Sequence, residues 1–169
     1  FVLISLLSGG LRSASGTLMV LGLVACFLGD VLGPRSFLAG VACFLIGHLL
    51  FIAAFALRRS SVRKGAMVFA LFALISVVVL WGLIGRAEGA EKPMAIAYAL
   101  VISVMVGFAA GTGHLPGGRL ITAGAVVFYI SDIAVAWWKF VGGDFPYDWI
   151  CYPLYYGACT MLAFGAGLV

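Results

Sequence analysis

The sequence predicts an all-α protein, a polytopic bundle of transmembrane helices that forms a single domain over residues 1–169. The first observation is composition: 64% of the residues are hydrophobic and 9% are charged, whereas a soluble domain carries about 25% charged residues. The second is the length of the apolar runs, because runs of about 20 residues match a helix that crosses a bilayer. A transmembrane β-strand would need only about 10 residues, with alternating polarity.

Six apolar runs are long enough to cross the membrane. We expect full spans at about residues 15–33, 36–57, 65–85, 93–112, 119–141 and 149–169. Ser13 or Ser15 is the expected N-cap of the first span. Residues 1–8 are apolar but too short to span, so they are expected to be the remnant of a helix that begins upstream. The chain opens at Phe1 inside this run and without Met, so we expect further N-terminal residues.

The basic residues lie at the ends of the spans and predict the orientation. One side carries six of them, Arg12, Arg58, Arg59, Arg63, Lys64 and Arg119. The other carries Arg35, Arg86, Lys92 and Lys139, together with the loop acids Glu88, Glu91, Asp144 and Asp148. Basic residues favour the cytoplasmic side, so the first side and the C-terminus are predicted to be cytoplasmic, in a bacterial inner membrane. Charges so placed contact lipid phosphates, and no nucleic acid partner is expected.

Two helix faces stand out by their composition. In the first span, small residues recur every three or four positions, at Gly22, Cys26, Gly29 and Gly33. Such a stripe lets a neighbouring helix approach closely. The third span is nearly featureless and is expected to face lipid. The four cysteines lie within apolar segments without metal-type spacing, so they are interpreted as packing residues, and we expect no metal or other cofactor.

Two acidic residues lie within the predicted spans, Asp30 and Asp132. A charged side chain at the centre of a bilayer costs about 2.5–3.5 kcal/mol even on insertion scales, so such residues usually mark a functional site. Their two helices run in the same direction, which places both carboxyl groups in the same half of the bundle. Two carboxyl groups in a low-dielectric pocket do not both stay ionised, so one can act as an acid and the other as a base. The alternative is that each aspartate is a polar anchor, satisfied by hydrogen bonds.

Other polar side chains within the spans can line a pocket around these acids. His48 can relay a proton, contact a substrate or simply bond to a neighbouring helix. The remaining candidates for substrate contact are Tyr98, Tyr129, Ser131, Tyr155 and Tyr156. Aromatic packing is the alternative for each tyrosine.

Five strings of this sequence resemble, in order, those of the YhhN-like lysoplasmalogenase family. They are Leu28-Gly-Asp30-Val-Leu32, Phe44-Leu-Ile-Gly-His48 continuing to Phe55, Pro93 with Tyr98 to Met105, Phe128-Tyr-Ile-Ser-Asp132, and Tyr155-Tyr156. The resemblance implies a membrane protein of about eight helices and supports the missing N-terminal segment. It also implies hydrolysis of the vinyl ether bond of lysoplasmalogens, which releases a fatty aldehyde and a glycerophospho-base, with Asp30 and Asp132 as catalytic residues.

One residue departs from the family pattern. Where the family usually has Gln after Tyr-Tyr-x-Ala, this chain has Cys159, so an amide is absent from the expected pocket. This change bears on headgroup preference and on activity.

The residues suit this chemistry independently of the resemblance. A vinyl ether is cleaved by protonation of its β-carbon, and a neutral Asp in an apolar pocket is a suitable acid. A second carboxylate stabilises the cation and activates water. We therefore expect an enzyme whose partners are a lysophospholipid substrate and the bilayer, with Asp132, the deeper residue, as the acid. A small proton-coupled transporter that uses the same aspartates and a non-catalytic membrane subunit remain alternatives.

Overall fold

The computed structural model describes residues 1–58, 60–142 and 146–169. Within these ranges the chain forms seven α-helices and one 3₁₀ turn, without a strand, as the sequence predicts. The elements are α1 (Val2–Leu7), α2 (Ala14–Leu32), α3 (Phe37–Ala56), α4 (Val62–Leu83), η1 (Ile84–Arg86), α5 (Glu91–Gly111), α6 (Gly118–Phe140) and α7 (Tyr147–Gly167). Arg59 and Asp144, which entered the prediction of orientation, lie outside the described residues.

Five of the described helices, α2 to α6, are long and apolar enough to cross a membrane. The expected sixth span corresponds to α7, which is 21 residues long but does not belong to this group. Its tyrosines and Pro153 lower the mean hydropathy of this helix. The predicted count of six spans is therefore not confirmed, although all six predicted segments are helical.

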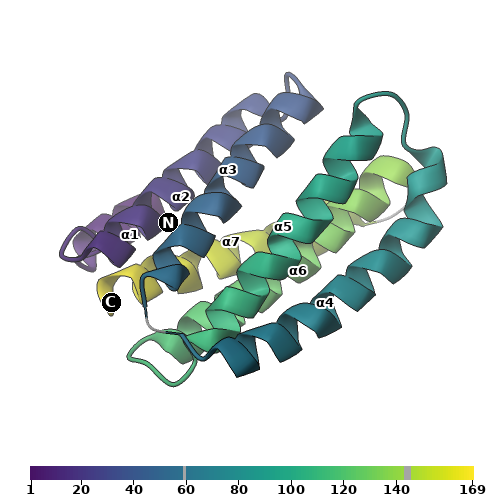
Figure 1. Cartoon of the computed structure of the whole chain (residues 1–169). Coiled ribbons are helices and arrows are strands. Elements are labelled where there is room, and N and C mark those ends of the chain that lie inside the picture. The colour runs from purple at the N-terminus through teal and green to yellow at the C-terminus, as the bar shows by residue number, and fades with distance from the viewer. Residues whose placement is uncertain (59, 143–145) are drawn as a thin grey trace.

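Neighbouring helices form three antiparallel hairpins, α2 with α3, α4 with α5, and α6 with α7 (Figure 1). Helix α5 packs against α3 and α6, whereas α7 packs against α2 and the short α1. The C-terminal ends of α2, α4 and α6 therefore lie at one end of the bundle (Figure 1). The two chain termini lie near the opposite end (Figure 1).

The hairpin of α2 and α3 depends on the small-residue stripe. A Cβ atom on Gly22 would lie 2.6 Å from the Phe51 ring, and one on Gly29 would lie 2.8 Å from the Phe44 ring. Both rings belong to α3, so α2 needs these glycines to approach it. The predicted close approach is confirmed, and it positions the part of α3 that carries Phe44 and His48.

Serine side chains fix both ends of this hairpin. Ser13, one of the two expected caps, accepts a hydrogen bond from the Gly16 N–H at 2.9 Å and so caps α2. Ser15 instead donates to the Ala54 carbonyl of α3 at 2.9 Å. Ser36 caps the start of α3 through the Ala39 N–H at 3.3 Å.

Helix α4 lies at the outside of the bundle, as the featureless third span predicts. Only Ser76 and Leu83 of this helix are buried, and Trp81 is 86% exposed. A face so apolar and so exposed suits contact with lipid. Ser76 is the buried polar residue of this nearly featureless span.

Candidate active site

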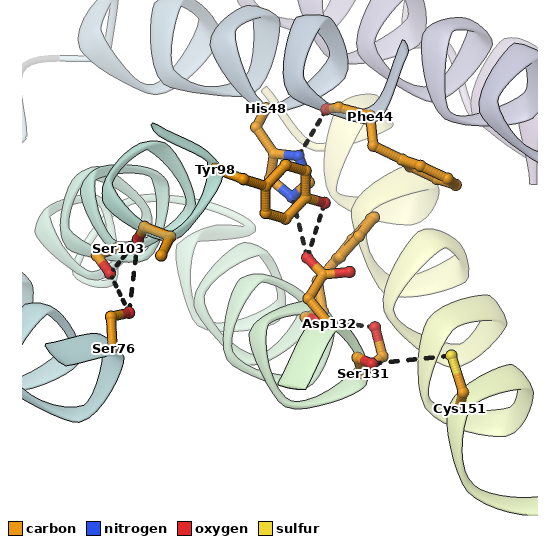
Figure 2. A network of polar contacts seen from close by, with 10 residues as sticks. Phe44, His48, Ser76, Tyr98, Ser103, Ser131, Asp132 and Cys151 are labelled. Atoms are coloured by element: carbon orange, nitrogen blue, oxygen red, sulfur yellow. Dashed lines mark hydrogen bonds and ion pairs between the residues drawn. The ribbon is translucent and has the colours of Figure 1, made fainter. Parts of the chain in front are cut away.

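Asp132 lies in the interior of the bundle with two polar neighbours from other helices (Figure 2). The Tyr98 hydroxyl of α5 donates a hydrogen bond to Asp132 Oδ2 at 3.0 Å. His48 Nε2 of α3 lies 3.7 Å from the same oxygen. Three helices therefore converge on one carboxyl group, which offsets part of the cost of placing it within an apolar bundle.

The contacts of His48 define where its protons lie. Its Nδ1 lies 2.6 Å from the Phe44 carbonyl oxygen, which can only accept, so Nδ1 carries the proton. In the neutral ring, Nε2 then carries a lone pair, and this lone pair faces Asp132. Nε2 is buried and has no hydrogen-bond partner among the described residues. A lone pair against an ionised carboxylate is repulsive, so this geometry favours a proton on one of the two groups, either the Asp132 carboxyl or His48 Nε2.

Aromatic rings hold His48 in this orientation. The Phe128 ring lies 4.8 Å from the imidazole and the Tyr98 ring lies 5.3 Å from it, both edge-on. His48 is fully buried. The imidazole therefore has little freedom to turn away from Asp132.

Asp30 has a separate tyrosine donor. The Tyr155 hydroxyl of α7 donates to Asp30 Oδ2 at 2.9 Å. The Tyr155 ring packs edge-on against Phe44 at 5.7 Å and Phe128 at 5.4 Å. Phe44 and Phe128 also contact or bond to His48, so one aromatic cluster supports both aspartates. In the described hydrogen bonds each carboxyl group pairs with its own tyrosine and not with the other carboxyl group.

Both aspartates line a single cavity of about 750 Å³. Most of the expected substrate-contact residues line it too, namely Tyr98, Tyr129, Ser131, Tyr155 and Tyr156. His48 does not, because it lies behind Asp132. His48 Nε2 instead lies 3.7 Å from Asp132 Oδ2, and direct contact of His48 with a substrate stays a prediction.

Two of the expected contact residues already use their hydroxyl groups in the protein. The Tyr129 hydroxyl lies 2.8 Å from the Ser76 hydroxyl and donates to the Phe72 carbonyl at 3.1 Å. The Ser131 hydroxyl donates to the carbonyl of Phe128 at 2.7 Å. They form the wall of the cavity, and their hydroxyl groups are turned toward the helices.

A buried serine pair was missed from the sequence. Ser76 of α4 and Ser103 of α5 lie 2.9 Å apart (Figure 2). The Ser76 hydroxyl also bonds to the Tyr129 hydroxyl. This cluster ties the peripheral α4 to the two helices that carry Tyr98 and Asp132. A lone serine in an apolar run is the only sequence signal for it, and that signal is weak because serine often faces its own backbone.

The cavity reaches the end of the bundle where α4 ends and α5 and α7 begin. Its outer lining includes Glu91, Trp138, Lys139, Tyr147 and Asp148. The aromatic members, Trp138 and Tyr147, are of the residue types that are enriched at membrane–water interfaces. The cavity therefore joins an apolar interior with two acids to a rim that carries both charges.

The model of the YhhN family matches residues 1–166, nearly the whole chain. No solved structure matches the chain. The family match agrees with the resemblance found in the sequence motifs around Asp30 and Asp132, and the chain belongs to the YhhN family.

Proposed function

We propose that this protein is a membrane hydrolase that cleaves the vinyl ether bond of lysoplasmalogen-type lysophospholipids. The products are a fatty aldehyde and a glycerophospho-base. Family membership is consistent with this reaction, since lysoplasmalogen hydrolysis is what the motif resemblance implies. The observation that carries the proposal is the position of Asp132, whose Oδ2 lies 3.7 Å from His48 Nε2, at a cavity that Asp30 also lines.

The first step is protonation of carbon. Asp132 gives its proton to the β-carbon of the vinyl ether, and the π electrons form the new C–H bond. The ether oxygen then shares a lone pair with the adjacent carbon, which gives an oxocarbenium ion. The Asp132 carboxylate produced in the same step lies beside this cation and stabilises it. The Tyr98 hydroxyl already donates to that carboxylate.

The second step is addition of water. Asp30 takes a proton from a water molecule, and the oxygen of that water forms a bond to the oxocarbenium carbon, which gives a hemiacetal. On collapse, Asp30 returns that proton to the leaving glycerol oxygen. The hemiacetal hydroxyl loses its proton to Asp132 as the aldehyde forms. Both carboxyl groups thereby regain their starting states, and one water molecule is consumed.

The direct test measures aldehyde released by purified protein from a lysoplasmalogen in detergent. We expect activity in the wild type and a loss of at least about 10²-fold in Asp30→Asn and in Asp132→Asn, the range for removal of general acid–base catalysis. Glu88→Gln is the matched control, because Glu88 is an exposed acid outside the cavity. Full activity in either aspartate variant would remove that residue from the mechanism.

The placement of His48 beside Asp132 also suits a proton-coupled transporter, which is the second candidate. In that case no tested vinyl ether would yield aldehyde, and protein in vesicles would take up solute when a proton gradient is applied. The absence of broken helices at Asp30 and Asp132 favours the hydrolase, since transporters commonly bind at discontinuous helices.

A further inference from the structure

The rim of the cavity holds an ion pair that the proposed reaction does not use. Lys139 Nζ of α6 lies 2.7 Å from Glu91 Oε1 of α5, and it also lies 4.6 Å from the centre of the Phe37 ring of α3. The two charged side chains are 28% and 27% exposed. Both residues line the cavity that Asp132 lines, so this pair faces the path by which a ligand enters.

Lys139 and Asp132 are placed to contact two parts of one molecule. They are seven positions apart on α6, which is close to two full turns, so they share a face of the helix. The rise between them is about 10 Å. In a lysoplasmalogen, seven bonds join the phosphorus atom to the carbon that is protonated, about 8 Å when the chain is extended. A phosphate at Lys139 therefore places the vinyl ether near Asp132.

The ion pair can exchange partners at little cost. Partly exposed salt bridges contribute little to stability, because water solvates both charges when they separate. A phosphate is an equally good partner for the lysine ammonium. When the phosphate binds Lys139, the Glu91 carboxylate is released at the same rim.

The released carboxylate and its neighbours suit a cation. Asp148 is exposed and lines the same part of the cavity. The Trp138 and Tyr147 rings stack at 4.9 Å, and Tyr152 packs edge-on to Tyr147 at 5.4 Å. Aromatic faces next to carboxylates bind organic ammonium groups. A purely anionic headgroup would meet Glu91 and Asp148 unfavourably, whereas a zwitterion satisfies both signs.

We propose that this rim is a binding site for a zwitterionic phospho-base headgroup. Lys139 binds the phosphate, Glu91 and Asp148 bind the ammonium, and the Trp138–Tyr147 stack packs against it. This inference rests on the proposed function for the identity of the reacting bond. The headgroup site itself depends only on the rim.

The first test compares two vinyl ethers that differ only at the headgroup, a lysoplasmenylethanolamine and a 1-alkenylglycerol without phosphate. We expect Lys139→Gln to raise the KM for the phospholipid at least tenfold more than the KM for the alkenylglycerol, and Lys139→Arg to restore most of the difference. Lys92→Gln is the matched control, because Lys92 is exposed and outside the cavity. An equal effect of Lys139→Gln on both substrates would overturn the proposal.

The second test uses the sign of the Glu91 effect. Glu91→Gln is expected to raise the KM for the ethanolamine lipid, because the ammonium loses a carboxylate partner. The same variant is expected to lower the KM for a 1-alkenylglycerophosphate, since Lys139 is then free and one repulsive charge is gone. Changes of the same sign for both lipids would contradict a zwitterion site.

A binding measurement separates this inference from the proposed function. The probe is 1-O-octylglycerophosphocholine, which has no vinyl ether and cannot be hydrolysed by the proposed reaction. Calorimetric titration below its micelle concentration is expected to show at least tenfold weaker binding to Lys139→Gln than to wild type. That loss without any aldehyde from vinyl ethers would support the headgroup site and refute the hydrolase. Aldehyde release together with unchanged binding of the probe to Lys139→Gln would support the hydrolase and refute the headgroup site.

Discussion

At the scale of single residues, the placement of Asp30 is unfavourable for the helix that carries it. Asp30 lies in the last turn of α2, which ends at Leu32. Helix C-termini carry a partial negative charge, so a carboxylate there is destabilising. The hydrogen bond from Tyr155 offsets part of this cost. Residues kept at a cost to stability are often functional, which supports Asp30 as the proposed base.

The hydrogen bond from Tyr98 to Asp132 gives one prediction. Removing the hydroxyl that donates to a charged group costs about 1.5–3 kcal/mol where the bond is made. At about 1.4 kcal/mol for each factor of ten, Tyr98→Phe is expected to lower kcat about 10- to 100-fold. Tyr129→Phe removes a hydroxyl bonded to Ser76, so we expect it to lower Tm more than kcat. Steady-state aldehyde assays and thermal unfolding measure both, and a wild-type kcat in Tyr98→Phe would contradict the assignment.

His48 gives a second prediction, because its two nitrogens have different partners. Asn can keep a donor near the Phe44 carbonyl but cannot reach Asp132, whereas Gln places an amide near the position of Nε2. His48→Asn is therefore expected to lower kcat about 10²-fold, the lower end of general acid–base effects, with KM within about twofold. His48→Gln is expected to lose less.

The split between kcat and KM distinguishes a positioning residue from a binding residue. His48 does not line the cavity, so its loss has no direct effect on substrate contact. A rise in KM with unchanged kcat would show instead that His48 contacts the substrate. Thermal unfolding of both variants checks that the buried site still folds.

At the scale of the helices, the site depends on how closely α2 and α3 approach. Gly22 faces the Phe51 ring, and a Cβ there would lie 2.6 Å from it. Overpacking of this kind typically costs about 1–3 kcal/mol, so Gly22→Ala is expected to lower the unfolding free energy by that amount. Gly82→Ala is the matched control, because a Cβ at Gly82 meets nothing within 4 Å.

The measurement for both glycine variants is thermal unfolding in detergent. Gly82→Ala is expected to be neutral or slightly stabilising, since alanine is the better helix former. Equal Tm values for the two variants would contradict the claim that the α2–α3 contact is tight.

At the scale of the whole molecule, the orientation in the membrane follows from the loops. We propose that the rim with Lys139 faces away from the cytoplasm, because the basic residues of the opposite end favour the cytoplasmic side. A membrane-impermeant maleimide is expected to label Glu88→Cys in intact cells. His114→Cys lies in an exposed loop at the other end and is expected to react only after permeabilisation.

The four native cysteines are buried or half-buried, so wild-type protein serves as the background. If His114→Cys were labelled in intact cells and Glu88→Cys were not, the orientation would be the opposite of the proposed one. A lipid that reaches the rim would then come from the other leaflet.

The fold class and the two acids of the candidate site can be read from the sequence alone. Long apolar runs leave a chain few alternatives to membrane helices, because every backbone polar group must be satisfied inside the bilayer. Asp30 and Asp132 stand out for the same reason, since a carboxyl group within such a run is costly wherever it points. These are properties of single segments and can be read from them one at a time.

The partners of these residues are visible only in the folded bundle, because the contacts join different helices. Tyr155 donates to Asp30, Nε2 of His48 faces Asp132, and Lys139 pairs with Glu91. Helix association in lipid depends on close packing of surfaces, so the rotation of each helix is set by its neighbours and not by its own polarity. A segment's sequence therefore shows which residue is unusual, whereas its partner is defined by the packing of the bundle.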